Sequence, residues 1–154
     1  MSRNLRHTLP VAAALSALLA GCVQAPEPPA LAGSRWQLVA LASMDDAQGT
    51  QRPAEPARYT LAFGTDGRAT LQLDCNCGSA GWQATPAVAG SPGRRSGSLQ
   101  FSALASTRAM CPPGSLAPAL GRALPFVRSY LLEGGQLHLS LMADGGILTW
   151  APAP

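Results

Sequence analysis

The chain has 154 residues, of which 47% are hydrophobic and only 12% are charged, and its formal net charge is +3. This balance favours a folded domain over intrinsic disorder. It argues against a nucleic-acid-binding surface, because without Arg3 and Arg6 near the N-terminus nine of the eleven basic residues remain against eight acidic ones.

The first 21 residues have the layout of a secretory signal peptide. Basic residues stand at positions 3 and 6, residues 9–20 are almost entirely apolar, and small residues precede Cys22. A transmembrane helix needs about 20 apolar residues, and prolines follow too soon here for a permanent span. We therefore predict that residues 1–21 are a cleaved signal peptide.

Leu19-Ala20-Gly21-Cys22 resembles the bacterial lipobox. The resemblance implies cleavage before Cys22, transfer of a diacylglycerol to its thiol and acylation of the new amine, and two or more acyl chains anchor a protein stably. Val23 follows instead of Asp, which by resemblance to the sorting rule of enteric bacteria predicts the outer membrane, facing the periplasm. The alternative is an ordinary signal peptide followed by a chance cysteine.

Beyond the anchor we predict a proline-rich tether at residues 22–30 and one domain at residues 31–152. Residues 34–41 form the first predicted strand, and residues 44–57 form a loop. The alternation in that strand places three apolar side chains on one face: Trp36, Leu38 and Ala40.

The clearest local pattern is a predicted hairpin. Residues 59–63 and 69–73 alternate between apolar and polar side chains, and the turn-forming pair Asp66-Gly67 lies between them. After it we predict a turn at Gly78–Trp82 that leads into a short strand, and then a loop at Pro86–Gly97.

A strand at Leu99–Phe101 precedes a predicted amphipathic helix that starts at Ser115 as its cap. Pro125 should kink or shorten this helix, and Gly134-Gly135 should end the segment. The helical spacing rests on five apolar residues: Leu116, Leu120, Leu124, Val127 and Leu131.

Two final strands are predicted at Leu137–Leu141 and Ile147–Trp150, with a turn at Asp144–Gly146 between them. The sum is an α+β fold of six to eight short strands, mostly antiparallel, in a curved sheet or small barrel that one helix caps. Three tryptophans are expected in its core: Trp36, Trp82 and Trp150.

Three cysteines remain in the predicted domain: Cys75, Cys77 and Cys111. The compartment beyond the inner membrane is oxidising, so one internal disulfide is expected and one thiol stays unpaired.

The order of several motifs resembles the META domain, also called the HslJ-type domain. The resemblance covers about residues 31–150 and rests on Leu31–Leu38, Leu61–Phe63 with Asp66–Arg68, Cys75-Asn76 with Gly81-Trp82, Leu99–Phe101, Leu104–Cys111 and Leu137–Leu139. It implies a conical, antiparallel, barrel-like sheet with a packed helix, an envelope setting and no firmly attached catalytic activity.

By position, the family's paired cysteines correspond to Cys75 and Cys111, and its motif residues to Asn76, Thr107 and Arg108. Cys77–Cys111 is the alternative bridge, because residues 75 and 77 of a strand point to the same side. The chain departs from the family pattern twice. Asp74 stands where a glycine is usual, which raises the question of a positive φ, and Cys77 is additional.

The same cysteines also suggest a metal site or a redox pair. Cys75, Cys77, Cys111 and His138 form a candidate zinc set, but the C-x-C spacing is tight for zinc. The same spacing does not match a redox pair, which opens a helix. We expect no metal and no cofactor, and we expect His138 to be a surface strand residue.

We expect Thr107 to cap or turn the backbone. Arg108 either pairs with an acid such as Asp74 or recognises an anionic partner, and the pairing with an acid is favoured.

The function predicted from the sequence is a non-enzymatic envelope lipoprotein that supports envelope integrity or stress tolerance. Its expected partners are the membrane, through the lipid, and an envelope protein or hydrophobic ligand at the mouth of the cone. The alternative is a protease-inhibitor-like module that presents Met44–Ala57 or Ala87–Gly97. An envelope hydrolase is less favoured, because no nucleophile, base or metal motif is present.

Overall fold

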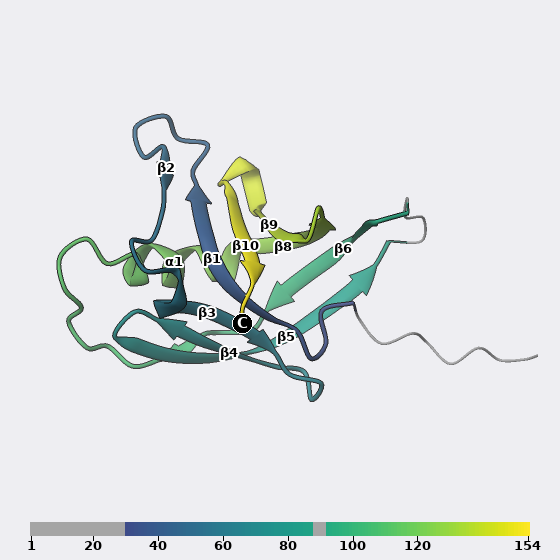
Figure 1. Cartoon of the computed structure of the whole chain (residues 1–154), viewed down its shortest axis with the longest axis horizontal. Coiled ribbons are helices and arrows are strands. Elements are labelled where there is room, and N and C mark those ends of the chain that lie inside the picture. Colours follow the sequence, from purple (N-terminus) through teal and green to yellow (C-terminus); the bar gives the residue numbers. More distant parts are fainter. Residues whose placement is uncertain (1–29, 88–91) are drawn as a thin grey trace, which may run out of the picture.

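Antiparallel strands that close into a ring dominate the computed structural model, which describes residues 30–87 and 92–154 (Figure 1). Within these residues eight strands form the ring, and the pairing of the last strand with the first closes it. In order around the ring they are β1 (Arg35–Ala42), β3 (Tyr59–Phe63), β4 (Arg68–Leu73), β5 (Asn76–Pro86), β6 (Arg94–Phe101), β8 (Val127–Glu133), β9 (Gln136–Leu141) and β10 (Ile147–Pro152).

Two short strands add to the ring: β2 (Thr50–Gln51) pairs with β1, and β7 (Ala105–Ser106) pairs with β5. Within the described part of the chain there is one α-helix, α1 (Ala117–Ala123). The predicted α+β fold, with a mostly antiparallel, barrel-like sheet and a single helix, is therefore confirmed.

The core fills the inside of the barrel because alternate side chains of each strand point inward. Burial alternates residue by residue along β3, β9 and β10. The Phe63 ring meets Trp82 edge-on with centroids 5.0 Å apart. The prediction that the tryptophans lie in the core is confirmed, since all three are buried: Trp36, Trp82 and Trp150.

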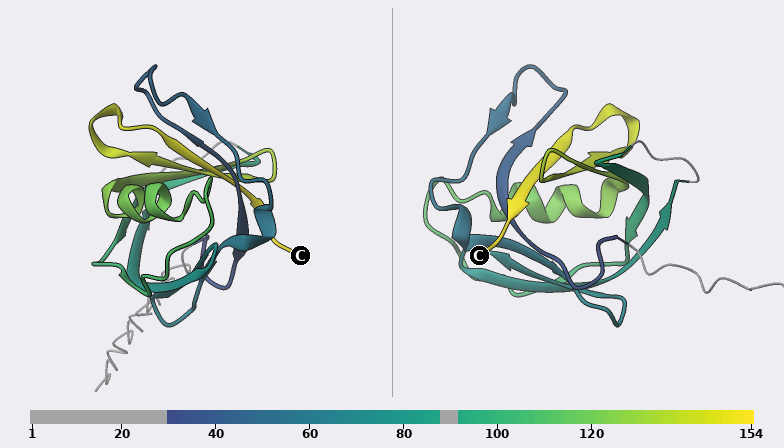
Figure 2. Two further views of the ribbon diagram at one scale, coloured as in Figure 1. Left: turned by 90° about the vertical axis from the view of Figure 1, so that its left-hand side faces the viewer. Right: turned by 45° about the vertical axis from the view of Figure 1, so that its right-hand side comes forward.

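The helix α1 lies between the β9–β10 hairpin and the β3–β4 strands in both views of Figure 2. It buries Ala117 and Leu120, and a following 3₁₀ turn, η2 (Leu124–Phe126), buries Leu124. These side chains join the barrel core, so the helix is part of the packed interior. Within the described ranges, no helix has the length and apolar character that crossing a membrane requires.

The helix is shorter than the sequence predicts. Val127 and Leu131 lie in β8, which pairs with β6 on one side and β9 on the other. Pro125 sits in η2, where the α-helical bonding has ended, as expected for a residue without an N–H group. The predicted cap is also wrong: Leu116 occupies the N-cap position, and Ser115 Oγ accepts a 3.3 Å hydrogen bond from the N–H of Ala117.

The predicted turn at Gly78–Trp82 is wrong, because those residues lie inside the long strand β5. Glycine and serine are weak strand formers, but Gly78 pairs with Leu71 of β4 on one side and Ser106 of β7 on the other. Tertiary pairing therefore overrides local preference.

The predicted loop at Pro86–Gly97 is shorter than expected, since β5 ends at Pro86 and β6 begins at Arg94. The Arg94 side chain lies 3.8 Å from Glu133 on the neighbouring β8. Part of the remaining connection, residues 88–91, lies outside the described residues.

Other local predictions are confirmed or refined. The predicted hairpin around Asp66-Gly67 is formed by β3 and β4, which pair antiparallel with Leu61 opposite Leu71. The predicted loop at residues 44–57 also contains β2 and the start of a 3₁₀ turn, η1 (Pro56–Arg58). The turn before β10 contains another, η3 (Met142–Asp144).

Tyr130 of β8 points into the core, where its hydroxyl has no hydrogen-bond partner among the described residues. Burial raises the pKa of Tyr130 above its ordinary value, and the positive charge of Arg95 opposes that rise only in part. The neutral phenol is thus favoured in the folded protein, while the unfolded chain ionises at an ordinary pH.

This difference predicts a loss of stability in alkali. As the pH rises through about 10, the unfolded chain gives up the Tyr130 proton first, so the free energy of unfolding falls. We expect Tyr130→Phe to remove that component of the fall and to leave stability near neutral pH unchanged or slightly higher, because an unpartnered hydroxyl is lost. Urea unfolding from neutral to alkaline pH measures both effects, and parallel pH profiles for the two proteins would contradict the assignment.

Candidate functional site

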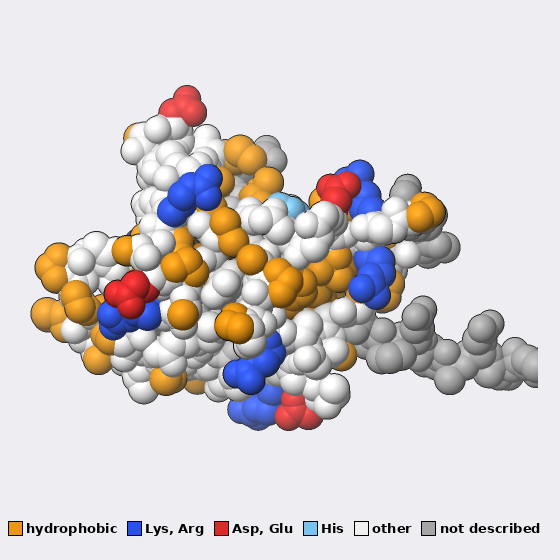
Figure 3. All heavy atoms as spheres, viewed as in Figure 1, with side chains coloured by type: hydrophobic (Ala, Val, Ile, Leu, Met, Phe, Trp, Pro, Cys, Tyr) orange, Lys and Arg blue, Asp and Glu red, His pale blue; other side chains and the backbone are white. Residues whose placement is uncertain are grey.

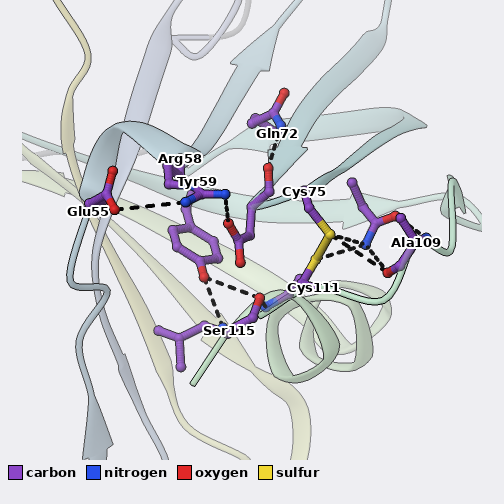
Figure 4. Close-up of polar contacts among 12 residues, drawn as sticks. Glu55, Arg58, Tyr59, Gln72, Cys75, Ala109, Cys111 and Ser115 are labelled. Carbon is purple, nitrogen blue, oxygen red and sulfur yellow. Dashed lines mark hydrogen bonds and ion pairs between the residues drawn. A yellow bond between two sulfur atoms is a disulfide. The ribbon is translucent and has the colours of Figure 1, made fainter. Parts of the chain in front are cut away.

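A segment that we call the strap, residues 102–116, runs from the end of β6 to the start of α1. It is held to the β4–β5 turn by Asn76 and a disulfide, and to β3 by Tyr59 (Figure 4). The strap contains the Thr107 and Arg108 of the family motif, so its attachment decides where those side chains lie.

The first attachment is the side chain of Asn76, at the start of β5, which is 8% exposed. Its Oδ1 accepts hydrogen bonds from the Ala109 N–H at 2.7 Å and the Thr107 hydroxyl at 2.9 Å. Its Nδ2 donates to the Ala109 carbonyl at 3.0 Å. Thr107 Oγ1 in turn accepts a 3.0 Å bond from the Cys77 N–H, so Thr107 fastens the strap to β5.

The second attachment is a disulfide between Cys75 and Cys111, with Cα atoms 5.5 Å apart. The alternative Cys77–Cys111 bridge is not formed; Cys77 is an exposed free thiol that lies 3.4 Å from Gln72 Oε1. Because two of the four candidate zinc ligands are joined as a disulfide, they are not available as thiolates.

The third attachment is Tyr59 of β3, which reaches the base of the strap. Its hydroxyl accepts a 3.0 Å hydrogen bond from the Leu116 N–H and lies 3.4 Å from Ser115 Oγ. The strap is thus fastened near its middle by Asn76 and the disulfide, and at its end by Tyr59.

The turn that carries these groups depends on Asp74. Its φ is 58°, in the region that favours glycine, so the position does take the positive φ that the family's usual glycine suggests. The buried carboxylate lies 2.7 Å from Arg58 Nη2, and the Asp74 N–H donates to the Arg58 carbonyl at 2.8 Å. The predicted pairing of Arg108 with Asp74 is therefore wrong, since Arg58 takes that place.

A groove of about 970 Å³ lies between the strap and α1. Most of its walls are apolar, and they include the side of the disulfide at Cys111. The two charged residues in its lining are Arg108 on the strap and Arg122 on α1. The lining residues are Leu73, Asn76, Ala103, Leu104, Ser106, Thr107, Arg108, Ala109, Met110, Cys111, Pro112, Gly114, Ser115, Ala117, Pro118, Gly121, Arg122 and Pro125.

Both guanidinium groups are available to a ligand. Arg108 and Arg122 are exposed, and among the described residues neither forms an ion pair. The floor is open at Gly121, where an added Cβ would meet no heavy atom within 4 Å. Met110, at the rim, is 99% exposed.

A second apolar groove, of about 620 Å³, lies on the other side of α1. Phe126 and Met142 in its lining are 50% and 43% exposed. Arg122 lines both grooves. On the face shown in Figure 3, charged side chains of both signs are few and scattered, with hydrophobic side chains between them.

His138 lies away from these residues, on β9, where its Nδ1 is 3.3 Å from Thr149 Oγ1 of β10. Cys22 lies outside the described residues. Three participants were missed by the sequence analysis: Arg58, Tyr59 and Arg122. For Arg122 a signal existed, because it is the one charged residue of α1 in a run of small and apolar residues.

Comparisons with known proteins agree with this geometry. The family described as "META domain" matches residues 29–153. No curated protein matches the chain by sequence. A crystal structure of a DUF4847 family protein from Bacteroides vulgatus ATCC 8482 superposes with a TM-score of 0.50 at 14% sequence identity, over 79% of this chain and 94% of that chain. At that identity the likeness shows the fold alone.

The hydrogen bonds of Asn76 predict how much this residue contributes to the stability of the fold. We expect Asn76→Ala to lower the free energy of unfolding by about 2–4 kcal/mol, because three hydrogen bonds between its buried amide and the strap are lost together, each contributing about 0.5–1.5 kcal/mol. Guanidinium unfolding of the oxidised protein measures this loss. Thr70→Ala, an exposed change on β4, is the matched control and should stay within about 0.5 kcal/mol. Equal effects of the two changes would mean that Asn76 does not hold the strap.

Proposed function

Because this chain belongs to the META domain family, we propose that it is a lipid-anchored envelope protein without catalytic activity, whose groove binds another envelope protein or a hydrophobic group. Through that binding it would support envelope integrity or stress tolerance. The groove between the strap and α1 is the observation that carries the proposal.

The envelope location is supported by the sequence and by the disulfide. The lipobox-like run that ends at Cys22 supplies the anchor, and residues 22–30 supply a short tether. A Cys75–Cys111 disulfide is stable in the oxidising space outside the inner membrane and uncommon in the cytosol. The proposed side of the membrane is the periplasmic face of the outer membrane.

The binding role is supported by the size and stiffness of the groove. Its volume of about 970 Å³ lies at the upper end of the range for small-molecule sites, which are mostly apolar with a few placed polar groups. The disulfide, Asn76 and Tyr59 fix one wall in advance. A preformed wall reduces the entropy that is lost when a ligand binds.

The chemistry of the lining also favours binding over catalysis. It contains no carboxylate, no imidazole and no free thiol, since Cys111 is in the disulfide. The arginines are permanently protonated and do not act as bases. What the lining offers is apolar contact and positive charge.

The anchor has a direct test. We expect the wild-type protein to fractionate with the membranes and the Cys22→Ala variant to lose its lipid, because no acceptor thiol remains. Metabolic labelling with a fatty-acid analogue, followed by mass spectrometry of the N-terminal peptide, measures the modification. An unlabelled wild-type protein that starts at a residue other than Cys22 would contradict the proposal.

The groove is tested by photo-crosslinking in cells. We expect a photoreactive phenylalanine analogue in place of Met110 to give a defined adduct with an envelope protein or a lipid, because that position stands exposed at the rim. The analogue in place of Met44, which is also exposed but lines neither groove, is the matched control.

A blocking variant ties the adduct to the groove. Gly121→Phe places a ring in the open space, so the Met110 adduct should disappear, whereas Gly121→Ala should keep it. Thermal unfolding confirms that both variants are folded. Equal adducts from the Met110 and Met44 positions, or an adduct that survives Gly121→Phe, would speak against binding in the groove.

A further inference from the structure

Two positive charges line the groove from opposite walls. Arg108 stands on the strap and Arg122 on α1, and no aspartate or glutamate lines the space between them. A guanidinium group without a negative neighbour can form charge-assisted hydrogen bonds to an anionic ligand. The groove is therefore complementary to a ligand with a negative group.

The rest of the groove is complementary to hydrocarbon. Apart from the arginines, its larger side chains are Leu73, Leu104, Met110 and three prolines. Prolines offer carbon surface and no N–H group. Gly121 adds no side chain to the wall formed by α1, and a Cβ added there would meet no heavy atom within 4 Å.

Several polar groups of the groove are engaged within the protein, which argues against a peptide as the occupant. Asn76 bonds to the strap, Thr107 bonds to Asn76 and β5, and the N–H of Ala109 bonds to Asn76. An extended peptide would bring an N–H and a carbonyl at every residue and find few partners. An occupant with one anionic end and a body free of polar groups avoids that cost.

The position of the groove makes the protein's own lipid a poor occupant. In Figure 1 the strap lies at one end of the molecule, and β1, which follows the tether, starts towards the other. The acyl groups that the resemblance predicts on Cys22 are esters and amides and carry no negative charge. They would leave both arginines without a partner.

From these observations we infer that the groove binds a fatty acid, whose carboxylate is held by the arginines of the lining, Arg108 and Arg122, and whose hydrocarbon contacts the apolar walls. This inference rests on the proposed function, because it names the ligand class of the same groove. Two arginines on one carboxylate supply the selectivity for the anion, and the apolar walls supply the contact with the chain.

The test uses the lipidated protein in isolated envelope membranes. Membranes are incubated with a fatty acid that carries a diazirine, illuminated, and the modified peptides are mapped by mass spectrometry. We expect adducts on the strap and on α1. Laurate should compete at about tenfold lower concentration than dodecanol, which has the same chain length and no charge.

Charge variants separate the two arginines from general basicity. The Arg108→Gln, Arg122→Gln double variant should erase the difference between laurate and dodecanol. The Arg35→Gln, Arg68→Gln double variant is the matched control, because both arginines are exposed and outside the groove, and it should keep the difference. Gly121→Phe should abolish labelling of the strap by the diazirine fatty acid.

Several results would overturn the inference. Equal competition by laurate and dodecanol would remove the role of charge, and labelling displaced by a lysophospholipid but not by laurate would replace the carboxylate with a phosphate. An absence of adducts on the strap and α1 would exclude the fatty acid altogether. If the Met110 position still captured an envelope protein in cells, the inference would fail while the proposed function stood.

Discussion

The hydrogen bonds of one buried amide, that of Asn76, determine where the functional surface lies. The same side chain accepts from the strap with its oxygen and donates to the strap with its nitrogen, so it fits one position of that segment only. The adjacent disulfide prevents the strap from leaving, and the amide sets its register. The wall of the groove that carries Arg108 is fixed by this pair of neighbours.

The opposite wall depends on how α1 divides its surface. Seven residues make two turns, and the helix presents Ala117 and Leu120 to the core, Pro118 and Gly121 to the groove, and Ala119 and Ala123 to the second groove. Arg122 lies at the boundary of the two grooves. Small residues on both outer faces keep the grooves open. A helix of only seven residues can therefore pack into the core and also line both grooves.

The sequence predicts the fold better than the site, for physical reasons. The alternation of apolar and polar residues identifies the β3–β4 hairpin, because each of its strands has one face towards the core and one face towards solvent. Alternation fails to identify the start of β5, where Gly78 and Ser79 are weak strand formers and become strand because they pair with β4 on one side and with β7, which is distant in the sequence, on the other. The spacing of the apolar residues that follow Leu124 suits a helix as well as a strand. Val127 and Leu131 become strand because β8 pairs with β6 and β9. The groove could not be predicted from the sequence, because its two walls, the strap and α1, come together only when the strap is attached to β5 and β3.

The pairing of β1 with β10 has a consequence for the order in which the chain folds. β1 is made early, yet Leu38 finds its partner Trp150 only when the last strand has arrived. Contacts of such long range are slow to form, because the loop that they close is nearly the whole domain. Until then β1 and β9 are open edges that can pair with other chains, and afterwards they are covered. The final strand thus closes the barrel. Once β10 has been synthesised and has paired with β1 and β9, the period in which the new chain is prone to aggregate through these edges ends.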